Sequence, residues 1–443
     1  MERFGLDFGT TNSSLSWARG DGEVTLCSVD LAAVNPHVLR SLLYYSPDTR
    51  GFVVGQRAID EYLGEDMQGT LMQSIKTFLA DDSFEQTWVY DRFYTLEDLI
   101  AVLFRHVRAA INALTPDDVS LVIGRPAVFV DRPEKERLAQ ERLRKAAELA
   151  GFFEVDFAYE PTAAGLAYES TLSSPEVALI ADLGGGTSDF TVMRLGTRAT
   201  DDRRDAILGT GGVYVGGDTF DARIMQHKLA RYFGAGTTYR SMEGQQLPFP
   251  TRLLAQVHRW HHVPFLRSPQ TREQLRRLRW TCSQPSAVAA LEALVEGNYA
   301  FFLFQEIERA KSQLSADEST LIQFTQPEIA ISEPLTRVEF EQLIAADLAT
   351  IERCMSGVLA AAGLRSADVE SVFLTGGSAQ IPALQRLFAA EFGAHKLKAQ
   401  DYLTSVAVGL GLTAARKAGG RGRGHSPMIL TSTRLVRRPS NSP

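Results

Sequence analysis

Two short stretches of the chain pair an aspartate with a turn rich in glycine and threonine. One spans Asp7–Asn12 and the other spans Asp182–Asp189. In each, the aspartate ends an apolar run, and a second run rich in β-forming residues follows the turn. This order predicts a strand, a tight turn and a second strand at both places.

The predicted turns contain the residue types that bind phosphate groups. Glycine lets the backbone N–H groups of a turn approach phosphate oxygens, because no Cβ stands in the way. Threonine adds a hydroxyl donor, and an aspartate at the end of a strand can hold a metal ion that bridges phosphates. Two such hairpins can clamp one polyphosphate between them. The turn residues concerned are Gly9, Thr10, Thr11, Asn12, Gly184, Gly185, Gly186 and Thr187.

A single Asp-Gly-Thr sequence is weak evidence, since ordinary turns contain it. Asp7 alone fits a carboxylate that stabilises a turn, and Asp182–Asp189 alone fits a glycine-rich hairpin without a ligand. Further segments favour a nucleotide. Glu160–Tyr168 places a carboxylate at a strand end, before a helix of small residues. Leu374–Pro382 ends a strand in the turn Gly376-Gly377-Ser378, which suits close contact with a flat base or its α-phosphate.

A helical segment adds a polar face. Within Glu306–Ser315, the side chains of Glu308, Lys311, Ser312 and Ser315 follow the spacing i, i+3, i+4 and i+7, so they share one side of the helix. Such a face on an otherwise apolar helix can hydrogen-bond a ribose and an adenine. The sequence therefore predicts a site for ATP.

Alternating strands and helices must position these residues. The predicted strands and helices of the first half are Val24–Val29, Phe52–Val54, the helix Leu96–Ala113, Leu121–Pro126, the helix Glu134–Ala150, Phe157–Pro161 and the helix Thr162–Tyr168. The second half begins near Val177 and includes a glycine-rich turn at Gly209–Gly217, strands at Thr320–Phe324, Glu328–Ile331 and Ser371–Thr375, and a final helix at Leu403–Lys417. We predict an α/β fold of two related lobes, 1–175 and 176–418, each with a mixed sheet flanked by helices around a nucleotide cleft. An α-rich insertion is expected at about 220–314, and a basic disordered tail at 419–443.

Composition narrows the class of protein. The chain has 443 residues, 44% of them hydrophobic, and a net charge of −7, which argues against general nucleic-acid binding. Its three cysteines lie far apart and predict a reducing compartment without disulfides, so the expected location is the cytoplasm. Neither a signal peptide nor a membrane span is expected.

The motifs together resemble the actin-like ATPase superfamily and, within it, the heat-shock protein 70 (DnaK-type) chaperones. The resemblance covers about residues 3 to 418 and includes Gly216–Asp221 in addition to the segments above. It implies that Thr10, Thr11, Gly185, Gly186 and Thr187 hold the phosphates of ATP or ADP. It also implies that Asp7 and Asp182 hold Mg²⁺, largely through waters. The nucleoside side would be lined by Gly216, Gly217, Asp218, Glu308, Lys311, Ser312, Ser315, Gly376, Gly377, Ser378 and Gln380.

The resemblance also implies a catalytic set. Lys76 matches the family's lysine that reaches the γ-phosphate, and with Mg²⁺ it would offset charge on the γ-phosphoryl oxygens. Taken alone, Lys76 also fits a solvated surface lysine. The attacking water and the metal shell would be ordered by Asp7, Glu160, Asp182 and Asp189, beside Thr187.

Several positions depart from the family pattern. Ser312 and Gln380 stand where the family has arginines beside the adenine, so base binding should be weaker or less selective. Asn12 replaces an aromatic residue. Pro126 matches a proline that relays the nucleotide state, but its usual arginine partner aligns with Gln140, with Arg137 or Arg142 as substitutes. The interdomain linker and the peptide-binding domain of the family are expected to be missing.

The leading hypothesis is an ATP-binding, slowly hydrolysing, chaperone-like protein whose nucleotide state opens and closes two lobes, with client or co-chaperone proteins as partners. The alternatives are a filament-forming actin-like protein, a small-molecule kinase of the same superfamily, and a nucleotide-responsive scaffold without hydrolysis. His258 and His262 have a spacing that could bind a metal on a helix, although a basic partner-facing surface with His261 and neighbouring arginines fits better.

Overall fold

The first sheet carries the first of the two predicted hairpins. In the computed structural model its strand order is β11 (Glu154–Tyr159), β10 (Val119–Arg125), β1 (Glu2–Phe8), β2 (Asn12–Ala18) and β3 (Val24–Leu26), and β4 (Val38–Arg40) also pairs with β2. Strand β1 is antiparallel to β2 and parallel to β10, which is parallel to β11. The structure describes residues 1–19, 23–65, 68–90, 92–115, 118–126, 133–169, 172, 174–196, 206–259, 263, 266–399 and 404–420.

The second sheet repeats this arrangement. Its order is β14 (Ile207–Val213), β13 (Ser188–Leu195), β12 (Glu176–Leu183), β19 (Ser371–Thr375) and β20 (Leu397–Ala399). Strand β12 is antiparallel to β13 and parallel to β19, which is parallel to β20. The same strand order and directions therefore occur twice, which confirms the predicted α/β actin-like fold with a duplicated hairpin.

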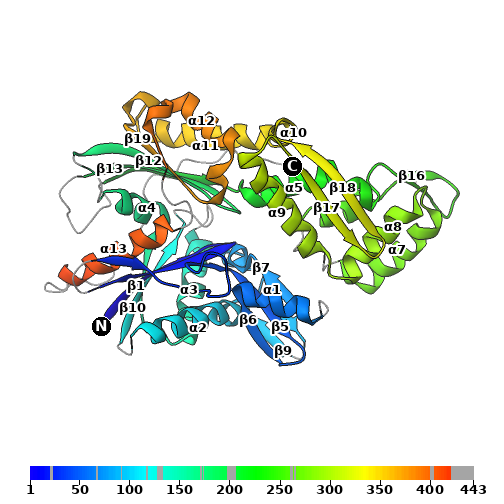
Figure 1. Cartoon of the computed structure of the whole chain (residues 1–443), viewed down its shortest axis with the longest axis horizontal. Helices are drawn as coiled ribbons and strands as arrows, with labels where there is room; N and C mark the ends of the chain where they lie inside the picture. Colours follow the sequence, from blue (N-terminus) through cyan, green and yellow to red (C-terminus); the bar gives the residue numbers. More distant parts are fainter. Residues whose placement is uncertain are drawn as a thin grey trace. The chain divides into compact units, whose positions relative to one another are not determined.

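The helices that follow the two sheets pack against each other. Helix α3 (Pro133–Leu149) joins β10 to β11 and α4 (Glu160–Glu169) follows, just as α12 (Pro382–Phe392) joins β19 to β20 and α13 (Ser405–Gly420) follows. Helix α4 also contacts β12 and β13, and α13 contacts β1 and β2, so the pair lies between the sheets (Figure 1).

Glycine residues allow α4 and α13 to cross at short distance. A Cβ on Gly409 of α13 would stand 1.7 Å from the carbonyl oxygen of Ala163 in α4. A Cβ on Gly5 of β1 would stand 2.4 Å from the backbone nitrogen of Gly411. The small residues of α4, which the sequence predicted, therefore pack against glycines of α13 and hold the two sheets together.

The remaining elements of the first half are helices that share a core with the first sheet and small strands that form sheets of their own. Helix α2 (Leu96–Leu114) packs on α3, and the small strands β5 (Leu42–Ser46), β6 (Gly51–Val54) and β7 (Thr70–Gln73) form a separate sheet beside α1 (Gly55–Gly64). A 3₁₀ turn, η1 (Ile75–Phe78), follows β7, and the hairpin β8 (Gln86–Val89) and β9 (Arg92–Thr95) leads into α2. One apolar core joins α2 and α3 to the first sheet.

The chain divides into two compact units. The first unit contains Met1–Val215, Thr350–Ala379 and the chain from Leu384 onward, and the second contains Gly216–Ala349 with Gln380–Ala383. Both five-strand orders described above therefore belong to the first unit. The predicted lobe boundaries, 1–175 and 176–418, stay a prediction.

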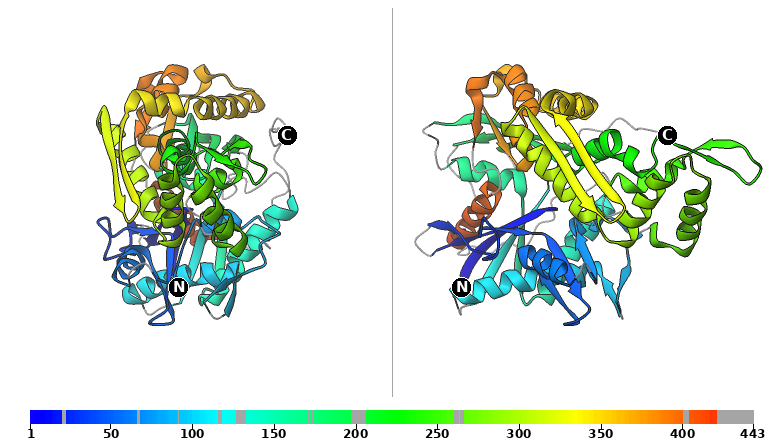
Figure 2. Two further views of the ribbon diagram at one scale, coloured as in Figure 1. Left: turned by 90° about the vertical axis from the view of Figure 1, so that its right-hand side faces the viewer. Right: turned by 45° about the vertical axis from the view of Figure 1, so that its right-hand side comes forward.

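The second unit is mainly helical. Its helices are α5 (Gly217–Ile224), a π turn (Met225–Leu229), a 3₁₀ turn (Ala230–Phe233), α6 (Thr251–Val257), α7 (Pro269–Thr281), α8 (Pro285–Glu296), α9 (Ala300–Ala316) and α10 (Arg337–Leu343). The hairpin β15 (Thr238–Arg240) and β16 (Gln246–Pro248) interrupts them, and the hairpin β17 (Ser319–Gln326) and β18 (Ile329–Thr336) runs along α9 (Figure 2). Helix α11 (Ala345–Ala361) leaves the second unit and enters the first.

One predicted element is wrong. The sequence suggested a glycine-rich turn at Gly209–Gly217, but strand β14 occupies Ile207–Val213. The glycines serve close packing there, because a Cβ on Gly211 would stand 2.8 Å from the Val358 side chain of α11. A Cβ on Gly212 would stand 2.2 Å from Oδ1 of Asp189.

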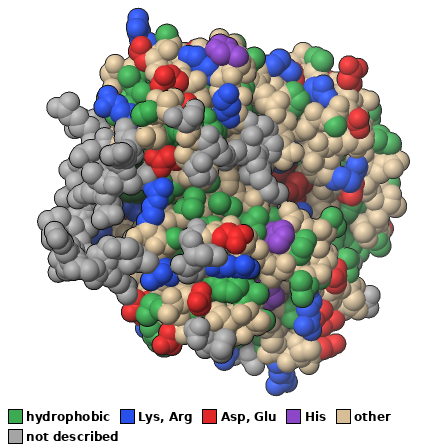
Figure 3. Space-filling model, turned by 60° about the vertical axis from the view of Figure 1, so that its left-hand side comes forward, with side chains coloured by type: hydrophobic (Ala, Val, Ile, Leu, Met, Phe, Trp, Pro, Cys, Tyr) green, Lys and Arg blue, Asp and Glu red, His purple; other side chains and the backbone are tan. Residues whose placement is uncertain are grey.

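Basic and acidic side chains are interspersed on the face of the molecule in Figure 3, without a large patch of one sign among the described residues. Within the described ranges, no single helix has both the length and the apolar character to cross a membrane, and the bent pair α8 and α9 meets that test by length and composition only. The tail beyond 420, His261 and His262 lie outside the described residues. The expectation that the chain does not bind nucleic acid stays a prediction.

Candidate functional site

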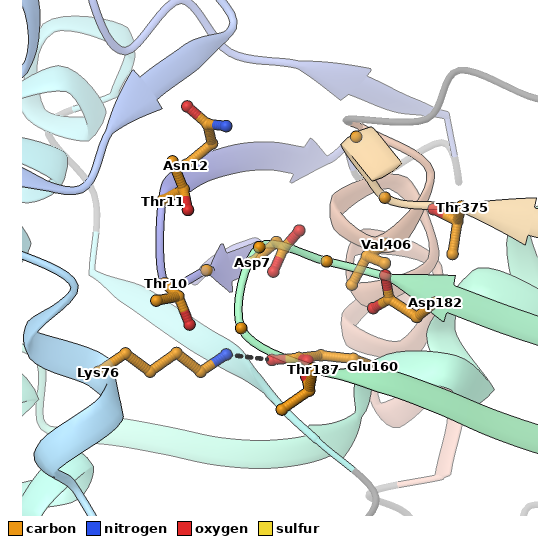
Figure 4. A pocket seen from close by; sticks show the side chains of 16 residues that line it. Asp7, Thr10, Thr11, Asn12, Lys76, Glu160, Asp182, Thr187, Thr375 and Val406 are labelled. Atoms are coloured by element: carbon orange, nitrogen blue, oxygen red, sulfur yellow. Dashed lines mark hydrogen bonds and ion pairs between the residues drawn. The ribbon is translucent and has the colours of Figure 1, made fainter. Parts of the chain in front are cut away.

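A pocket in the first unit collects residues from both hairpins (Figure 4). Both turns contribute, together with the start of α4, η1, the end of β19 and the first turn of α13. Its lining consists of Asp7, Gly9, Thr10, Thr11, Asn12, Lys76, Glu160, Asp182, Gly184, Gly185, Gly186, Thr187, Thr375, Gly376, Gly377 and Val406. The fold therefore brings together the residues predicted to bind phosphates.

The first turn contains a buried hydroxyl group that none of the described residues binds. A Cβ on Gly9 would stand 2.1 Å from the carbonyl oxygen of Asn12, so the turn requires glycine there. Ser41 Oγ donates a 2.8 Å hydrogen bond to the carbonyl oxygen of Gly9. Thr11 Oγ1 is buried and has no hydrogen-bond partner among the residues that the structure describes. An unpartnered buried hydroxyl is unfavourable, and a ligand oxygen in the pocket would satisfy it.

The second turn is closed by its own backbone and faces the first. The amide of Gly184 donates to the carbonyl oxygen of Thr187 at 2.9 Å. A Cβ on Gly186 would stand 3.8 Å from Thr10 Oγ1, so the two turns approach each other. Thr187 Oγ1 donates a 2.7 Å hydrogen bond to Asp189, which is buried behind the turn and does not line the pocket.

A lysine and a glutamate form an ion pair on one side of the pocket. Lys76 Nζ lies 2.7 Å from Oε1 of Glu160, and each side chain is about 10% exposed. Lys76 extends from η1, and Glu160 is the first residue of α4. Ser74, just before η1, has the left-handed backbone conformation, with φ of 57°. The pair stands beside the phosphate turns (Figure 4).

The pocket holds more acidic side chains than basic ones. Burial raises the pKa of Asp7 well above its usual range, and the charge of Glu160 adds to the shift. Burial and the charge of Glu160 raise the pKa of Asp182 to about 7. Burial lowers the pKa of Lys76, but the charges of Glu160 and Asp7 outweigh this effect, so its pKa lies above the usual value. One lysine thus faces three carboxyl groups in a partly buried pocket.

This charge balance fits a divalent cation. Carboxylate oxygens are the ligands that Mg²⁺ prefers, and Mg²⁺ usually keeps several waters in its shell. Within the described residues, no group of three His, Cys, Asp or Glu side chains is arranged to hold a metal directly. Asp7 and Asp182 therefore fit a cation whose remaining ligands are waters and phosphate oxygens. Of the histidines suggested for a metal site, only His258 lies within the described part of the chain.

The turn after β19 also approaches the pocket. Gly376 has φ of 82°, and a Cβ there would stand 2.4 Å from the carbonyl oxygen of Leu183, so glycine is required. Ser378, predicted to line the nucleoside side, does not line the pocket but donates from Oγ to the carbonyl oxygen of Gly184 at 2.9 Å. This bond ties the turn to the second hairpin.

Sequence reasoning missed two lining residues. Thr375 pairs in register with Asp182 on neighbouring parallel strands, and its hydroxyl lies 2.9 Å from that of Ser405. The alignment of strand ends in a parallel pair was a signal for Thr375. Val406 lies in the first turn of α13 and has no sequence signal that distinguishes it from a core valine.

The other residues predicted for the nucleoside side lie in the second unit. They are Gly216, Gly217, Asp218, Glu308, Lys311, Ser312, Ser315 and Gln380. Lys311 Nζ lies 2.8 Å from Oδ1 of Asp221 and donates to the carbonyl oxygen of Gly217 at 3.2 Å. Burial raises the pKa of Asp221 to about 7, against the opposing charge of Lys311. Sequence reasoning assigned no role to Asp221, although it stands one helical turn from Gly217.

A duplicated sheet with two phosphate-type hairpins around one pocket defines the class of actin-like ATPase folds. The sequence model of the family described as Hsp70 protein matches residues 3–243 and 298–430, which is most of the chain. The chain belongs to the Hsp70 family, whose members are ATPases.

Curated relatives agree with this assignment. The chaperone protein DnaK of Thermosipho africanus is 25% identical over 435 residues, which cover 96% of this chain and 61% of the relative. DnaK of Thermotoga petrophila is 26% identical over 452 residues, covering 98% and 62%. DnaK of Thermotoga neapolitana is also 26% identical over 452 residues, with the same coverage. The chain thus spans about three fifths of the length of these relatives.

Proposed function

We propose that this chain binds ATP and ADP with Mg²⁺ in the pocket of the first unit and hydrolyses ATP slowly. One observation carries the proposal: turns from two repeated sheets meet in a pocket that also holds the Lys76–Glu160 pair, Asp7 and Asp182. Two turns without a shared ligand are not expected to meet beside this group of charged side chains.

The turns would hold the phosphates. Backbone N–H groups of Gly185 and Gly186 and the hydroxyl groups of Thr10 and Thr11 are donors without bulky side chains between them. The buried Thr11 hydroxyl, which lacks a partner among the described residues, would donate to a phosphate oxygen. Mg²⁺, held by Asp7 and Asp182 through waters, would neutralise charge on the phosphate oxygens.

The remaining polar residues would orient the reaction. Phosphoryl transfer depends on positioning and charge neutralisation more than on covalent chemistry. Lys76 would place its ammonium group at the γ-phosphate, and Glu160 would hold Lys76 in that orientation and order the attacking water. Thr187 would be kept in one rotamer by its hydrogen bond to Asp189.

The residues that the family resemblance implies for the nucleoside stay a prediction. Ser312 and Gln380 replace the stacking arginines that the resemblance implies, so we expect weak selectivity for adenine. These replacements also favour a second candidate function, a nucleotide-responsive scaffold with negligible hydrolysis.

Wider roles follow the family resemblance. We propose that the nucleotide state controls the closure of two lobes and that client or co-chaperone proteins respond to it, in the cytoplasm. The expectation that the chain lacks a peptide-binding domain stays a prediction.

The test compares turnover of ATP by the wild type with that of Asp182→Ala and Thr187→Ala. We expect slow Mg²⁺-dependent hydrolysis by the wild type and a loss of about tenfold or more in each variant, because each loses a group that positions the phosphates or the metal. Binding without turnover in the wild type would favour the scaffold function. If the wild type neither binds nor hydrolyses ATP, the proposal is overturned.

A further inference from the structure

The segment that carries Lys76 has little regular structure of its own. Lys76 lies in the short 3₁₀ turn η1, and an irregular loop, 79–85, leads from it to β8. Local bonds close only small turns: the amide of Asp81 donates to the carbonyl oxygen of Phe78 at 3.0 Å, and the amide of Phe84 donates to that of Asp81 at 3.2 Å. Such a segment needs support from outside to hold a side chain in one place.

One arginine on α3 supplies that support. Nη1 of Arg142 donates to the carbonyl oxygens of Phe78, Leu79 and Asp81 at 3.0, 3.1 and 2.9 Å. Its Nη2 donates to the carbonyl oxygen of Phe84 at 2.6 Å. A single guanidinium group therefore binds four carbonyl groups of the backbone of 78–84. Its planar arrangement of donors allows these bonds, whereas the ammonium group of a lysine would not.

Burial makes these bonds important. The side chain of Arg142 is 9% exposed, and its Nε lies 3.6 Å from Oε1 of Glu97 on α2, which balances part of the charge. If these hydrogen bonds were broken, each carbonyl group would lose a partner, and the buried guanidinium group would lose the partners that offset its charge. A second contact, between Lys135 of α3 and Asp82 at 2.8 Å, holds the outer side of the loop.

We propose that Arg142 is a positioning residue for the phosphoryl-transfer lysine. It fixes the loop immediately after η1, and thereby holds η1 where Lys76 Nζ reaches Glu160 beside the phosphate turns. Arg142 itself does not line the pocket, so it acts through Lys76. The inference rests on the proposed function.

The same contacts exclude another role for this arginine. The sequence suggested Arg137 or Arg142 as a replacement for the family's arginine that partners Pro126. Both terminal nitrogens of Arg142 are already bonded to the backbone of 78–84, so it is committed to that loop. Arg137 lies on the same helix and is exposed, which makes it a matched control.

The first experiment measures the loop without nucleotide. Amide hydrogen exchange of a peptide covering 75–85 is compared in the wild type, Arg142→Ala, Arg142→Lys and Arg137→Ala, at a temperature where all are folded by circular dichroism. We expect exchange to rise about tenfold or more in both Arg142 variants, while α2 and β10 and the Arg137→Ala protein stay at the wild-type rate. Unchanged exchange in Arg142→Ala would contradict the inference that Arg142 fixes the backbone of 78–84, a role called the clamp below.

The second experiment is a double-mutant cycle with Lys76→Ala, read out as single-turnover hydrolysis and as ADP affinity. If Arg142 acts through Lys76, Arg142→Ala lowers the rate about tenfold or more, leaves ADP affinity within about threefold, and causes no further loss in the Lys76→Ala background. If the rate losses of Arg142→Ala and Lys76→Ala multiply in the double variant, the positioning role is overturned. Absence of turnover in the wild type would overturn the proposed function and this role with it, while the exchange result would still decide whether the clamp exists.

Discussion

Replacing Thr11 by valine should raise stability and weaken nucleotide binding at the same time. Valine has nearly the shape of threonine, so Thr11→Val exchanges only the hydroxyl group for a methyl group. In the structure this hydroxyl is buried without a partner among the described residues, while the backbone carbonyl of Thr11 keeps its bond from the Ser41 amide at 2.8 Å. The substitution therefore removes an unsatisfied polar atom and leaves the turn intact.

The magnitude follows from the cost of an unpartnered buried hydroxyl. Removing it should stabilise the ligand-free protein by about 1 kcal/mol, seen as a rise of roughly 1–2 °C in the thermal midpoint. ATP affinity should fall by about 5- to 30-fold, because the phosphate loses a donor worth about 1–2 kcal/mol.

Thermal unfolding without nucleotide and calorimetric titration with Mg-ATP measure the two effects. Thr11→Ser keeps the hydroxyl group and serves as the control, with affinity near that of the wild type. A Thr11→Val protein that is less stable and binds ATP as tightly as the wild type would refute the reasoning, since the hydroxyl group would then serve the fold and not the ligand.

Two further predictions concern the framework of the site. Gly409→Ala should destabilise the protein by about 3 kcal/mol or more in denaturant unfolding, because its Cβ would stand 1.7 Å from the carbonyl oxygen of Ala163, whereas Gly64→Ala, with no atom within 4 Å of its Cβ, should be neutral or slightly stabilising. Equal effects of the two changes would contradict the close helix crossing. Burial raises the pKa of Cys27 to about 12, so at pH 8 its thiolate fraction is about 10⁻⁴ and alkylation, followed by mass spectrometry, should be about a thousandfold slower than for an ordinary thiol and faster by about tenfold per pH unit. The partly exposed Cys354 should react first, and faster labelling of Cys27 in the folded protein would contradict its burial.

The hairpins and the alternation of strands and helices could be predicted from local sequence. Strand β19 occupies Ser371–Thr375 as expected, and α2 differs from its predicted range by one residue at its end. These elements have strong apolar periodicity and clear boundaries, which local patterns report well.

Glycine positions were harder to interpret. The glycines of β14 looked like a turn because sequence alone does not distinguish backbone freedom from close packing. Only the tertiary structure brings Val358 and Asp189 against Gly211 and Gly212. Glycine therefore indicated a special environment correctly, while the kind of environment depended on elements distant in the sequence.

The support of the site was also beyond sequence reasoning. The sequence suggested Arg142 only as a substitute partner for Pro126. Its contacts with the backbone carbonyl groups of 78–84 could not be predicted, because any sequence contains such groups. Likewise, Thr11 Oγ1 has no partner in the described part of the chain, and this is a property of its folded surroundings. Side chains that bind backbone groups leave no pairing pattern in a single sequence.

The central claim is that the pocket binds a nucleotide polyphosphate together with Mg²⁺. Calorimetric titration of the wild type with ATP, in Mg²⁺ and then in excess chelator, tests it most directly. Because one lysine faces three carboxyl groups, we predict binding with Mg²⁺ that weakens about tenfold or more when the ion is removed. Equal affinity with and without Mg²⁺, or no binding in either condition, would contradict it.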